Sequence, residues 1–235
     1  MHVADVEYFH GDLRLVGQIA VDDELEGERP AVLVSHDARG LSDHPKNVAR
    51  KLAQLGYVAF ALDYYGNGEE LDPEQVGPRF TELSSDPLLA RSIGNAGFEV
   101  LVGNEFADPA KVATIGYCFG GTLVLEMARG GTDVVATVGF HSGLSTSRPN
   151  DAKGIKGKVL VNIGADDPIV PPDQRLAFEE EMRKGGVDWQ MHLHGGAVHS
   201  FTDPAADGSN PAIKYDRRAD ERSWKAMLDL FAEVF

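Results

Sequence analysis

Short apolar runs alternate with amphipathic segments along most of this chain. Apolar runs bounded by Gly, Pro or polar residues are typical of buried strands, and apolar positions three or four residues apart are typical of helices. The runs predict strands at residues 3–9, 13–21, 31–35, 57–62, 111–115, 134–140, 159–163 and 189–193. The helical pattern predicts helices at 43–55, 86–102, 122–128, 172–184 and 216–235. This alternation, with short connections, favours an α/β fold in which helices flank both faces of a mostly parallel central sheet.

One segment departs from the alternation. Residues 63–78 are rich in Gly, Pro and acidic residues, and we interpret them as an excursion from the fold rather than as a linker between domains. A length of 235 residues is usual for one α/β domain. We therefore expect residues 1–235 to form a single domain.

Charge and composition narrow the choice of partners. The hydrophobic share of 43% and the charged share of 25% are ordinary for a globular protein, but the formal charge is −15. That charge repels nucleic acid and anionic membranes, so neither is expected as a partner. We see no secretory signal and no apolar run long enough to span a membrane, and the one cysteine excludes an internal disulfide. A cytoplasmic location is the expectation, and the oligomeric state stays open.

The cysteine lies in a pattern that favours nucleophilic chemistry. The predicted strand at 111–115 leads into Gly-Tyr-Cys-Phe-Gly-Gly at 116–121, and a predicted helix follows. A sharp strand–turn–helix elbow of this kind exposes its central residue above the sheet, and it needs neighbours without side chains. The start of the helix also favours a thiolate. Cys118 is therefore a candidate nucleophile; the alternative is an inert, buried cysteine.

Two later strands end in residues that complete a triad. Asp167 lies 49 residues after Cys118, and His199 follows after a further 32. The order of nucleophile, acid and histidine is that of α/β-hydrolases. His199 would serve as the base and Asp167 would orient it. Asp166 is the rival for the acid, and we favour Asp167 because it directly precedes Pro-Ile-Val.

A metal site is a weaker interpretation of the same region. His192, His194 and His199 could together offer three nitrogen ligands. However, the chain has neither an HExxH motif nor a paired Cys–His spacing. We therefore expect no metal.

Three motifs together resemble the dienelactone hydrolase family of α/β-hydrolases. They are GYCFGG around Cys118, GADDPIVP around Asp167 and GGAVHSF around His199. The resemblance extends over nearly the whole chain. It implies an α/β-hydrolase fold, a Cys-Asp-His triad, and cleavage of a small lactone or carboxylic ester through an acyl-enzyme. It implies no cofactor.

A fourth motif, HDARGL at 36–41, matches the loop that supplies an oxyanion amide in this family. The resemblance implies that the backbone N–H groups of Ala38 and Phe119 form the oxyanion hole. Asp37 stands where the family usually has a glutamate that modulates the resting cysteine. The alternative is that Asp37 is an ordinary loop or helix-capping carboxylate.

The substrate pocket departs from the family pattern. Family members that bind dienelactone hold its carboxylate with arginines, one of them soon after the catalytic histidine, where this chain has Asp203. The substrate class is therefore less certain than the reaction, and arginines elsewhere are either pocket residues or structural. The pocket candidates are Arg39, Tyr64, Tyr65, Arg91, His141 and Asp203.

Three functions remain in view. The first is a cysteine-dependent hydrolase of a small ester or lactone. The second is a thioesterase or other acyl hydrolase on the same scaffold, because a triad defines acyl transfer and not the leaving group. The third is a non-enzymatic binding protein with this fold, which a missing triad member would favour. Since all three members are present, an enzyme acting on a small molecule is the expectation.

Overall fold

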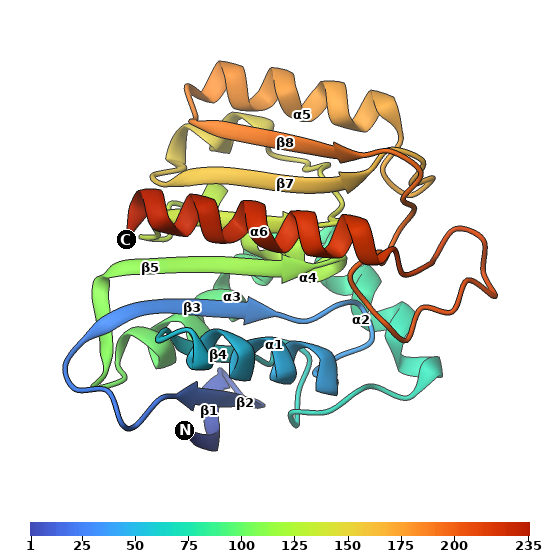
Figure 1. The fold of residues 1–235 in the computed structure, drawn as a ribbon. Coiled ribbons are helices and arrows are strands. Elements are labelled where there is room, and N and C mark those ends of the chain that lie inside the picture. Colours follow the sequence, from blue (N-terminus) through green and yellow to red (C-terminus); the bar gives the residue numbers. More distant parts are fainter.

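A single eight-stranded sheet forms the centre of the molecule (Figure 1). The computed structural model describes residues 1–235. The strand order is β1-β2-β4-β3-β5-β6-β7-β8, with β1 and β2 antiparallel to their neighbours and all later pairs parallel. The strands are β1 His2–His10, β2 Leu13–Val21, β3 Arg29–Ser35, β4 Val58–Leu62, β5 Ala107–Tyr117, β6 Ala136–Phe140, β7 Lys158–Gly164 and β8 Trp189–His194. The predicted α/β class and mostly parallel sheet are confirmed.

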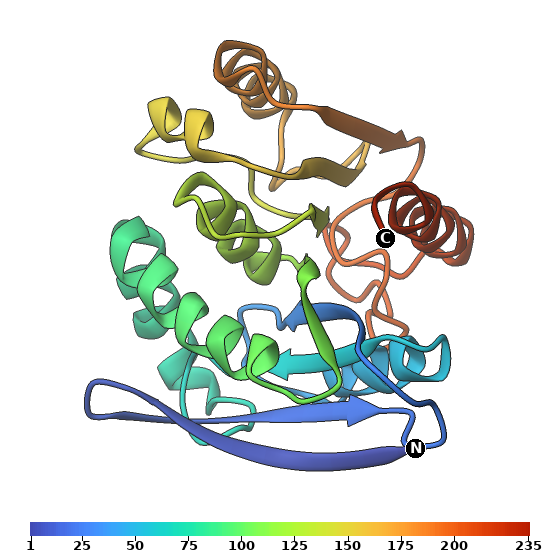
Figure 2. The same cartoon turned by 90° about the vertical axis from the view of Figure 1, so that its left-hand side faces the viewer.

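Helices cover both faces of the sheet (Figure 2). Helices α1 and α6 pack on one face, and α3 and α4 pack on the other. The helices are α1 Asp43–Gln54, α2 Pro73–Ser85, α3 Pro87–Val102, α4 Phe119–Arg129, α5 Pro172–Gly185 and α6 Arg217–Val234, with a short 3₁₀ helix, η1, at Pro149–Gly154. None of these helices is both long and apolar enough to cross a membrane.

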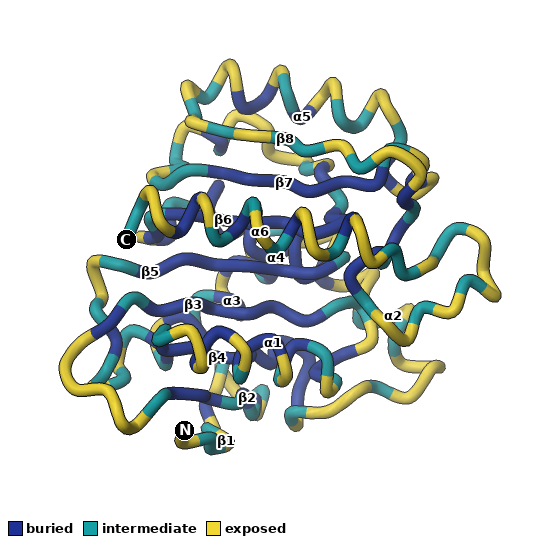
Figure 3. The backbone as a smooth tube through the Cα atoms, viewed as in Figure 1, coloured by how far each residue is buried: buried dark blue, intermediate teal, exposed yellow.

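The central strands are buried on both sides, which explains their nearly continuous apolar sequences (Figure 3). In β3, Ala31 and Leu33 join the apolar cluster beneath α3 and α4, while Val32 and Val34 join the cluster beneath α1 and α6. Alternate residues of a strand point to opposite faces, so one short strand supplies both cores. Because β3 to β8 are parallel, their carboxyl ends lie on the same edge of the sheet.

Helix α2 is the main difference from the sequence-based expectation. It begins at Pro73, within the segment interpreted as an excursion, and it continues through Pro78. Proline suits the first turn of a helix but normally disrupts the interior, and only Leu83 of this helix is buried. The usual signals of composition and apolar periodicity are therefore both absent. Helix α2 lies over the site edge with little attachment to the core.

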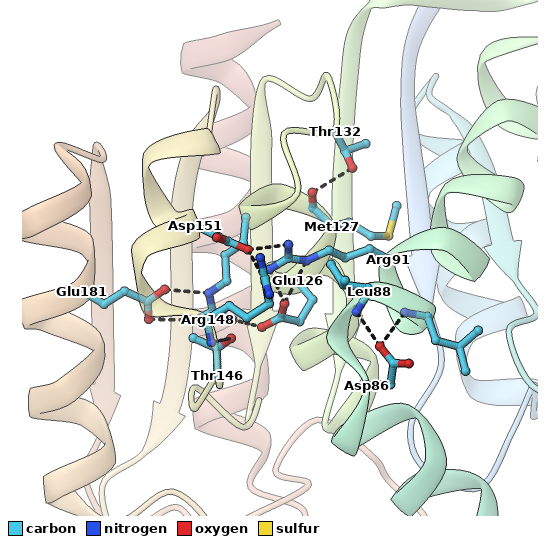
Figure 4. A network of polar contacts seen from close by, with 12 residues as sticks. Asp86, Leu88, Arg91, Glu126, Met127, Thr132, Thr146, Arg148, Asp151 and Glu181 are labelled. Atoms are coloured by element: carbon cyan, nitrogen blue, oxygen red, sulfur yellow. Dashed lines mark hydrogen bonds and ion pairs between the residues drawn. The ribbon is translucent and has the colours of Figure 1, made fainter.

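A network of buried ion pairs ties α4 to its neighbours (Figure 4). Arg91 of α3 donates to Glu126 at 2.8 and 3.0 Å and to Asp151 of η1 at 2.7 Å. Arg129, whose side chain is completely buried, donates to Glu126 at 2.9 Å and to Glu181 of α5 at 2.7 and 2.9 Å. Buried charges are tolerated only when paired in this way. The network therefore fixes α4 against α3, η1 and α5.

Replacing Arg129 by methionine should weaken the fold strongly. The Arg129→Met substitution removes one of the two arginine partners of Glu126 and the arginine partner of Glu181, and both carboxylates are buried. We expect the free energy of unfolding to fall by about 3–5 kcal/mol in urea titrations, the usual cost of removing one partner from a buried pair. The matched control is Arg217→Met, which breaks an exposed pair with Glu221 and should change stability by about 0.5 kcal/mol or less. Equal effects of the two substitutions would show that the network does not hold the helices together.

Candidate active site

Cys118 sits at a sharp turn between β5 and α4. Its backbone has φ 53° and ψ −118°, a conformation that non-glycine residues rarely adopt. Its N–H donates to the carbonyl oxygen of Phe140, on the neighbouring strand β6, at 2.9 Å. The turn directs the partly exposed thiol into a surface cleft at the start of α4. Helix dipoles favour negative charge at this position.

Two glycines make this turn possible. A Cβ atom on Gly116 would overlap the backbone of Gly120, on the far side of the turn. A Cβ atom on Gly120 would overlap the carbonyl oxygens of Ser35 and His36, at the end of β3. The elbow is therefore packed directly against the adjacent strand, and no larger residue fits at either position.

Asp167 and His199 form a buried hydrogen-bonded pair. His199 Nδ1 lies 2.7 Å from Asp167 Oδ2, and the two residues are 2% and 3% exposed. The other carboxylate oxygen of Asp167 accepts the backbone N–H of Ile169 at 2.8 Å. Asp166 is exposed and its carboxylate makes no hydrogen bond within the chain. Of the two candidate acids, the structure thus pairs Asp167 with the histidine.

The surroundings of His199 favour its protonated form. Burial lowers the pKa of His199, but the hydrogen bond to Asp167 and the neighbouring Cys118 sulfur raise it more, and the pKa is raised to about 10. The second ring nitrogen, Nε2, is buried and makes no hydrogen bond to nitrogen or oxygen. The hydrogen bond to Asp167 therefore favours the imidazolium form of His199.

The cleft around these residues has a volume of about 580 Å³. Cys118 and His199 both line it, together with the apolar side chains of Phe80, Ile169 and Ile213. The remaining lining residues are Asp37, Ala38, Arg39, Ser200, Asp203, Ala205, Ala206, Asp207, Ser209 and Asn210. A hollow of about 640 Å³ lies around Val134, Ile155 and Val187, and it contains neither Cys118 nor His199. The cleft that holds the cysteine and the histidine is therefore the candidate active site.

The two predicted oxyanion donors come from the loop after β3 and from the first turn of α4. Ala38 lines the cleft, and its N–H makes no hydrogen bond within the chain. Phe119 is the first residue of α4, where a helix has no carbonyl one turn earlier to accept the N–H. The backbone N–H groups of Ala38 and Phe119 stay the predicted oxyanion donors.

Asp37 lies in the cleft, but its carboxylate binds Arg39 rather than the sulfur. Its Oδ1 accepts the backbone N–H of Arg39 at 2.8 Å, and its Oδ2 accepts the guanidinium at 2.7 and 3.0 Å. Arg39 also donates to Asp203, on the loop after His199, at 3.0 Å. Arg39 and Asp203 both line the cleft, where their side chains form an ion pair with one another.

Two of the pocket candidates lie away from the cleft. Tyr64 is completely buried, where its hydroxyl donates to the carbonyl of His36 at 2.7 Å and its ring stacks on the His36 ring. Arg91 belongs to the buried ion-pair network. Both follow the pattern of structural residues, because their polar groups are fully used inside the protein.

The other two candidates lie behind the site. His141 is buried, with Nε2 2.8 Å from Thr202 Oγ1 and its ring edge-on to His199 at 5.0 Å. Tyr65 is 4% exposed, and its buried hydroxyl has no hydrogen-bond partner. It borders a separate hollow beside Arg79. Neither residue lines the cleft that contains Cys118 and His199.

The three histidines of the metal interpretation are not gathered around a common point. His192 and His194 lie on β8, where His194 is 3.3 Å from the Asn162 side chain, while His199 binds Asp167. No group of three or more His, Cys, Asp or Glu side chains is arranged to hold a metal ion.

Sequence reasoning missed much of the cleft wall. Phe80 comes from α2, and Ile213 comes from the loop at 200–216, which reaches outward from the sheet edge (Figure 1). This loop folds back on His199, whose N–H donates to Ala212 and whose carbonyl accepts from Lys214, both at 3.0 Å. The long interval between the histidine and the last helix was the available signal for such a wall.

Comparisons with known proteins agree on one family. The model of the dienelactone hydrolase family matches residues 17–235. The protein m3DLH is 42% identical with a TM-score of 0.96, and the match covers 100% of this chain and 98% of that one. The dienelactone hydrolase-like promiscuous phosphotriesterase P91 from metagenomic libraries is 40% identical with a TM-score of 0.95, over the same shares. Protein usf of Aquifex pyrophilus is 27% identical over 97% of each chain.

The histidine's raised pKa predicts a specific titration. In the wild type, His199 should stay protonated as pH rises through 7 and release its proton only near pH 10, its raised pKa. Asp167→Asn should lower that pKa, because a neutral amide no longer stabilises the cation. Asp166→Asn, the matched control, should leave it unchanged. NMR titration of labelled histidine, with the signal identified through His199→Asn, measures all three, and a larger shift in the Asp166 variant would contradict the pairing.

Proposed function

The chain belongs to the dienelactone hydrolase family of α/β-hydrolases, and from this premise we propose that it cleaves a small ester or lactone through a covalent bond to Cys118. The observation that carries the proposal is the hydrogen-bonded Asp167–His199 pair beside a strained cysteine in one cleft. Acyl transfer needs a nucleophile, a base and an orienting acid in this arrangement. No step requires a cofactor.

The first half of the reaction forms the acyl-enzyme. The Cys118 thiolate attacks the substrate carbonyl carbon, and the carbonyl oxygen becomes an oxyanion between the N–H groups of Ala38 and Phe119. The tetrahedral intermediate collapses with cleavage of the carbon–oxygen bond, and protonated His199 gives its proton to the leaving alkoxide. In a lactone the alcohol remains attached to the acyl group; in an ester it departs.

The second half releases the acid. Neutral His199 takes a proton from water, and the hydroxide attacks the thioester carbon in the same oxyanion hole. Collapse of this second intermediate breaks the carbon–sulfur bond, releases the carboxylic acid and leaves the Cys118 thiolate beside the histidine that was protonated in the preceding step. Asp167 stabilises the imidazolium and fixes its orientation in both halves. The strained turn holds the Cys118 side chain in the cleft during both halves of the reaction.

Two alternatives differ in what the cleft accepts. A thioesterase would use the same residues, so the ratio of turnover on an acyl-thioester and on its oxygen ester distinguishes the two activities. A binding protein without catalysis would not require a buried acid–histidine pair beside an accessible cysteine. The Asp167–His199 hydrogen bond and the cleft that His199 shares with Cys118 therefore support an enzyme.

Loss of the thiol should abolish turnover. We expect Cys118→Ala to lower kcat/KM on 4-nitrophenyl butyrate by about 10³-fold or more, as for removal of a triad member, with unchanged circular dichroism. Iodoacetamide should add one label per chain, since Cys118 is the only cysteine, and activity should fall in proportion. Undiminished turnover by the alanine variant would rule out the covalent mechanism.

A second candidate activity is the hydrolysis of a neutral phosphotriester. P91 carries this activity in its name, and the apolar wall of Phe80, Ile169 and Ile213 suits an uncharged organic ester. Attack of the Cys118 thiolate on phosphorus would expel the aryloxide, and water would then cleave the sulfur–phosphorus bond to regenerate the thiol. This chemistry uses the same residues as acyl transfer.

The phosphotriester activity has a direct signature. Diethyl 4-nitrophenyl phosphate should release 4-nitrophenolate, and intact-mass measurement should detect one diethylphosphoryl group on the wild-type chain. Cys118→Ala should show neither signal. Release without a covalent adduct, and at the same rate in the alanine variant, would point to a different route and remove this candidate.

A further inference from the structure

The candidate active-site cleft contains more negative than positive side chains. Its lining includes three carboxylates, from Asp37, Asp203 and Asp207, and only one guanidinium, from Arg39. No lysine and no other arginine lines the cleft. Apart from His199, whose positive charge is paired with Asp167, an anionic substrate would therefore have only the Arg39 guanidinium available, in a site whose carboxylates repel it.

The Arg39 guanidinium already contacts two carboxylates of the chain. Arg39 Nη2 lies 2.7 Å from Asp37 Oδ2 and 3.0 Å from Asp203 Oδ2, and Arg39 Nε lies 3.0 Å from Asp37 Oδ2. The side chains of Asp37 and Asp203 are only 20% and 15% exposed, so water screens them less than it screens surface carboxylates. One guanidinium shared by two carboxylates leaves a net negative charge.

Asp203 is held in position for this contact. Its second carboxylate oxygen accepts the backbone N–H of Ala205 at 2.9 Å, and its own N–H donates to the carbonyl of Ser200 at 3.0 Å. A carboxylate that is part of the chain competes with a dissolved one at a large advantage, because its positioning is already complete. Two of the three guanidinium nitrogens of Arg39, Nε and Nη2, are therefore already bound to carboxylates of the chain, and a substrate anion would have to compete with them.

We propose that the Asp37–Arg39–Asp203 bridge makes this cleft selective for esters and lactones that carry no negative charge. Asp203 takes the place that a substrate carboxylate would otherwise occupy on Arg39, and the excess carboxylate repels a second anion. The bridge acts on binding, since the charged group lies away from the reacting carbonyl and is felt equally in the ground and transition states. The inference rests on the proposed ester hydrolysis in this cleft.

A matched pair of substrates tests the selectivity. 4-Nitrophenyl hydrogen adipate and its methyl ester share the reacting carbonyl and differ in one remote negative charge. The wild type should have a kcat/KM about tenfold or more higher for the methyl ester, with the difference mainly in KM. Asp203→Asn should narrow this ratio to about threefold or less, because it removes a repelling carboxylate and releases part of Arg39.

Arg39→Met should move the ratio in the opposite direction. This variant removes the cation and leaves Asp37 and Asp203 uncompensated, so the preference for the methyl ester should widen by about tenfold. The matched control is Glu221→Gln, which changes the net charge by the same amount as Asp203→Asn. Glu221 is an exposed residue of α6. The ratio for this control should equal that of the wild type.

The wild type provides a test that needs no variant. Raising KCl from about 0.1 M to about 1 M shortens the Debye length from about 10 Å to about 3 Å, and the preference should shrink accordingly. A wild-type preference for the anionic half-ester, lost in Arg39→Met, would overturn the proposal and make Arg39 the receptor of a substrate carboxylate. Ratios that move no more in either variant than in Glu221→Gln would also overturn it. Retained turnover in Cys118→Ala would instead refute the covalent mechanism, since the selectivity ratio does not depend on the nucleophile.

Discussion

The left-handed backbone of Cys118 is the constraint on which the site depends. A residue with φ 53° and ψ −118° stays in this conformation only because its surroundings hold it there. The elbow is packed against the end of β3, where only glycine fits at position 120, and it is bonded to β6 through Phe140. Buried ion pairs join the helix that follows to α3 and α5. The core thus holds Cys118, the proposed nucleophile, in a strained conformation.

Much of this arrangement can be predicted from the sequence because it is local or ordered along the chain. The glycines on either side of Cys118 show the elbow, and the positions of Asp167 and His199 after two later strands give the order of acid and base. Parallel strands then bring their carboxyl ends to the same edge, so residues far apart in sequence meet without further information. The central strands are equally readable, since burial on both faces requires continuous apolar runs.

The remainder depends on pairings that no local pattern shows. Arg39 and Asp203 are 164 residues apart, and nothing near either residue reveals that they bind one another. Arg91 and Tyr64 have side chains typical of a pocket, yet their polar groups are satisfied inside the protein. Helix α2 contains an interior proline and a single buried residue, so neither periodicity nor propensity indicates it. Such features follow from packing of the whole chain.

The loop at 200–216 forms one wall of the cleft and lies outside the central sheet. Main-chain hydrogen bonds join this loop to the backbone of His199, and it contributes no strand to the sheet. Side chains such as Asn210 and Ile213 can therefore drift without disturbing the hydrophobic core or the elbow. Substitutions at these two positions would change the shape of the cleft wall and leave the sheet and the turn that carries Cys118 in place.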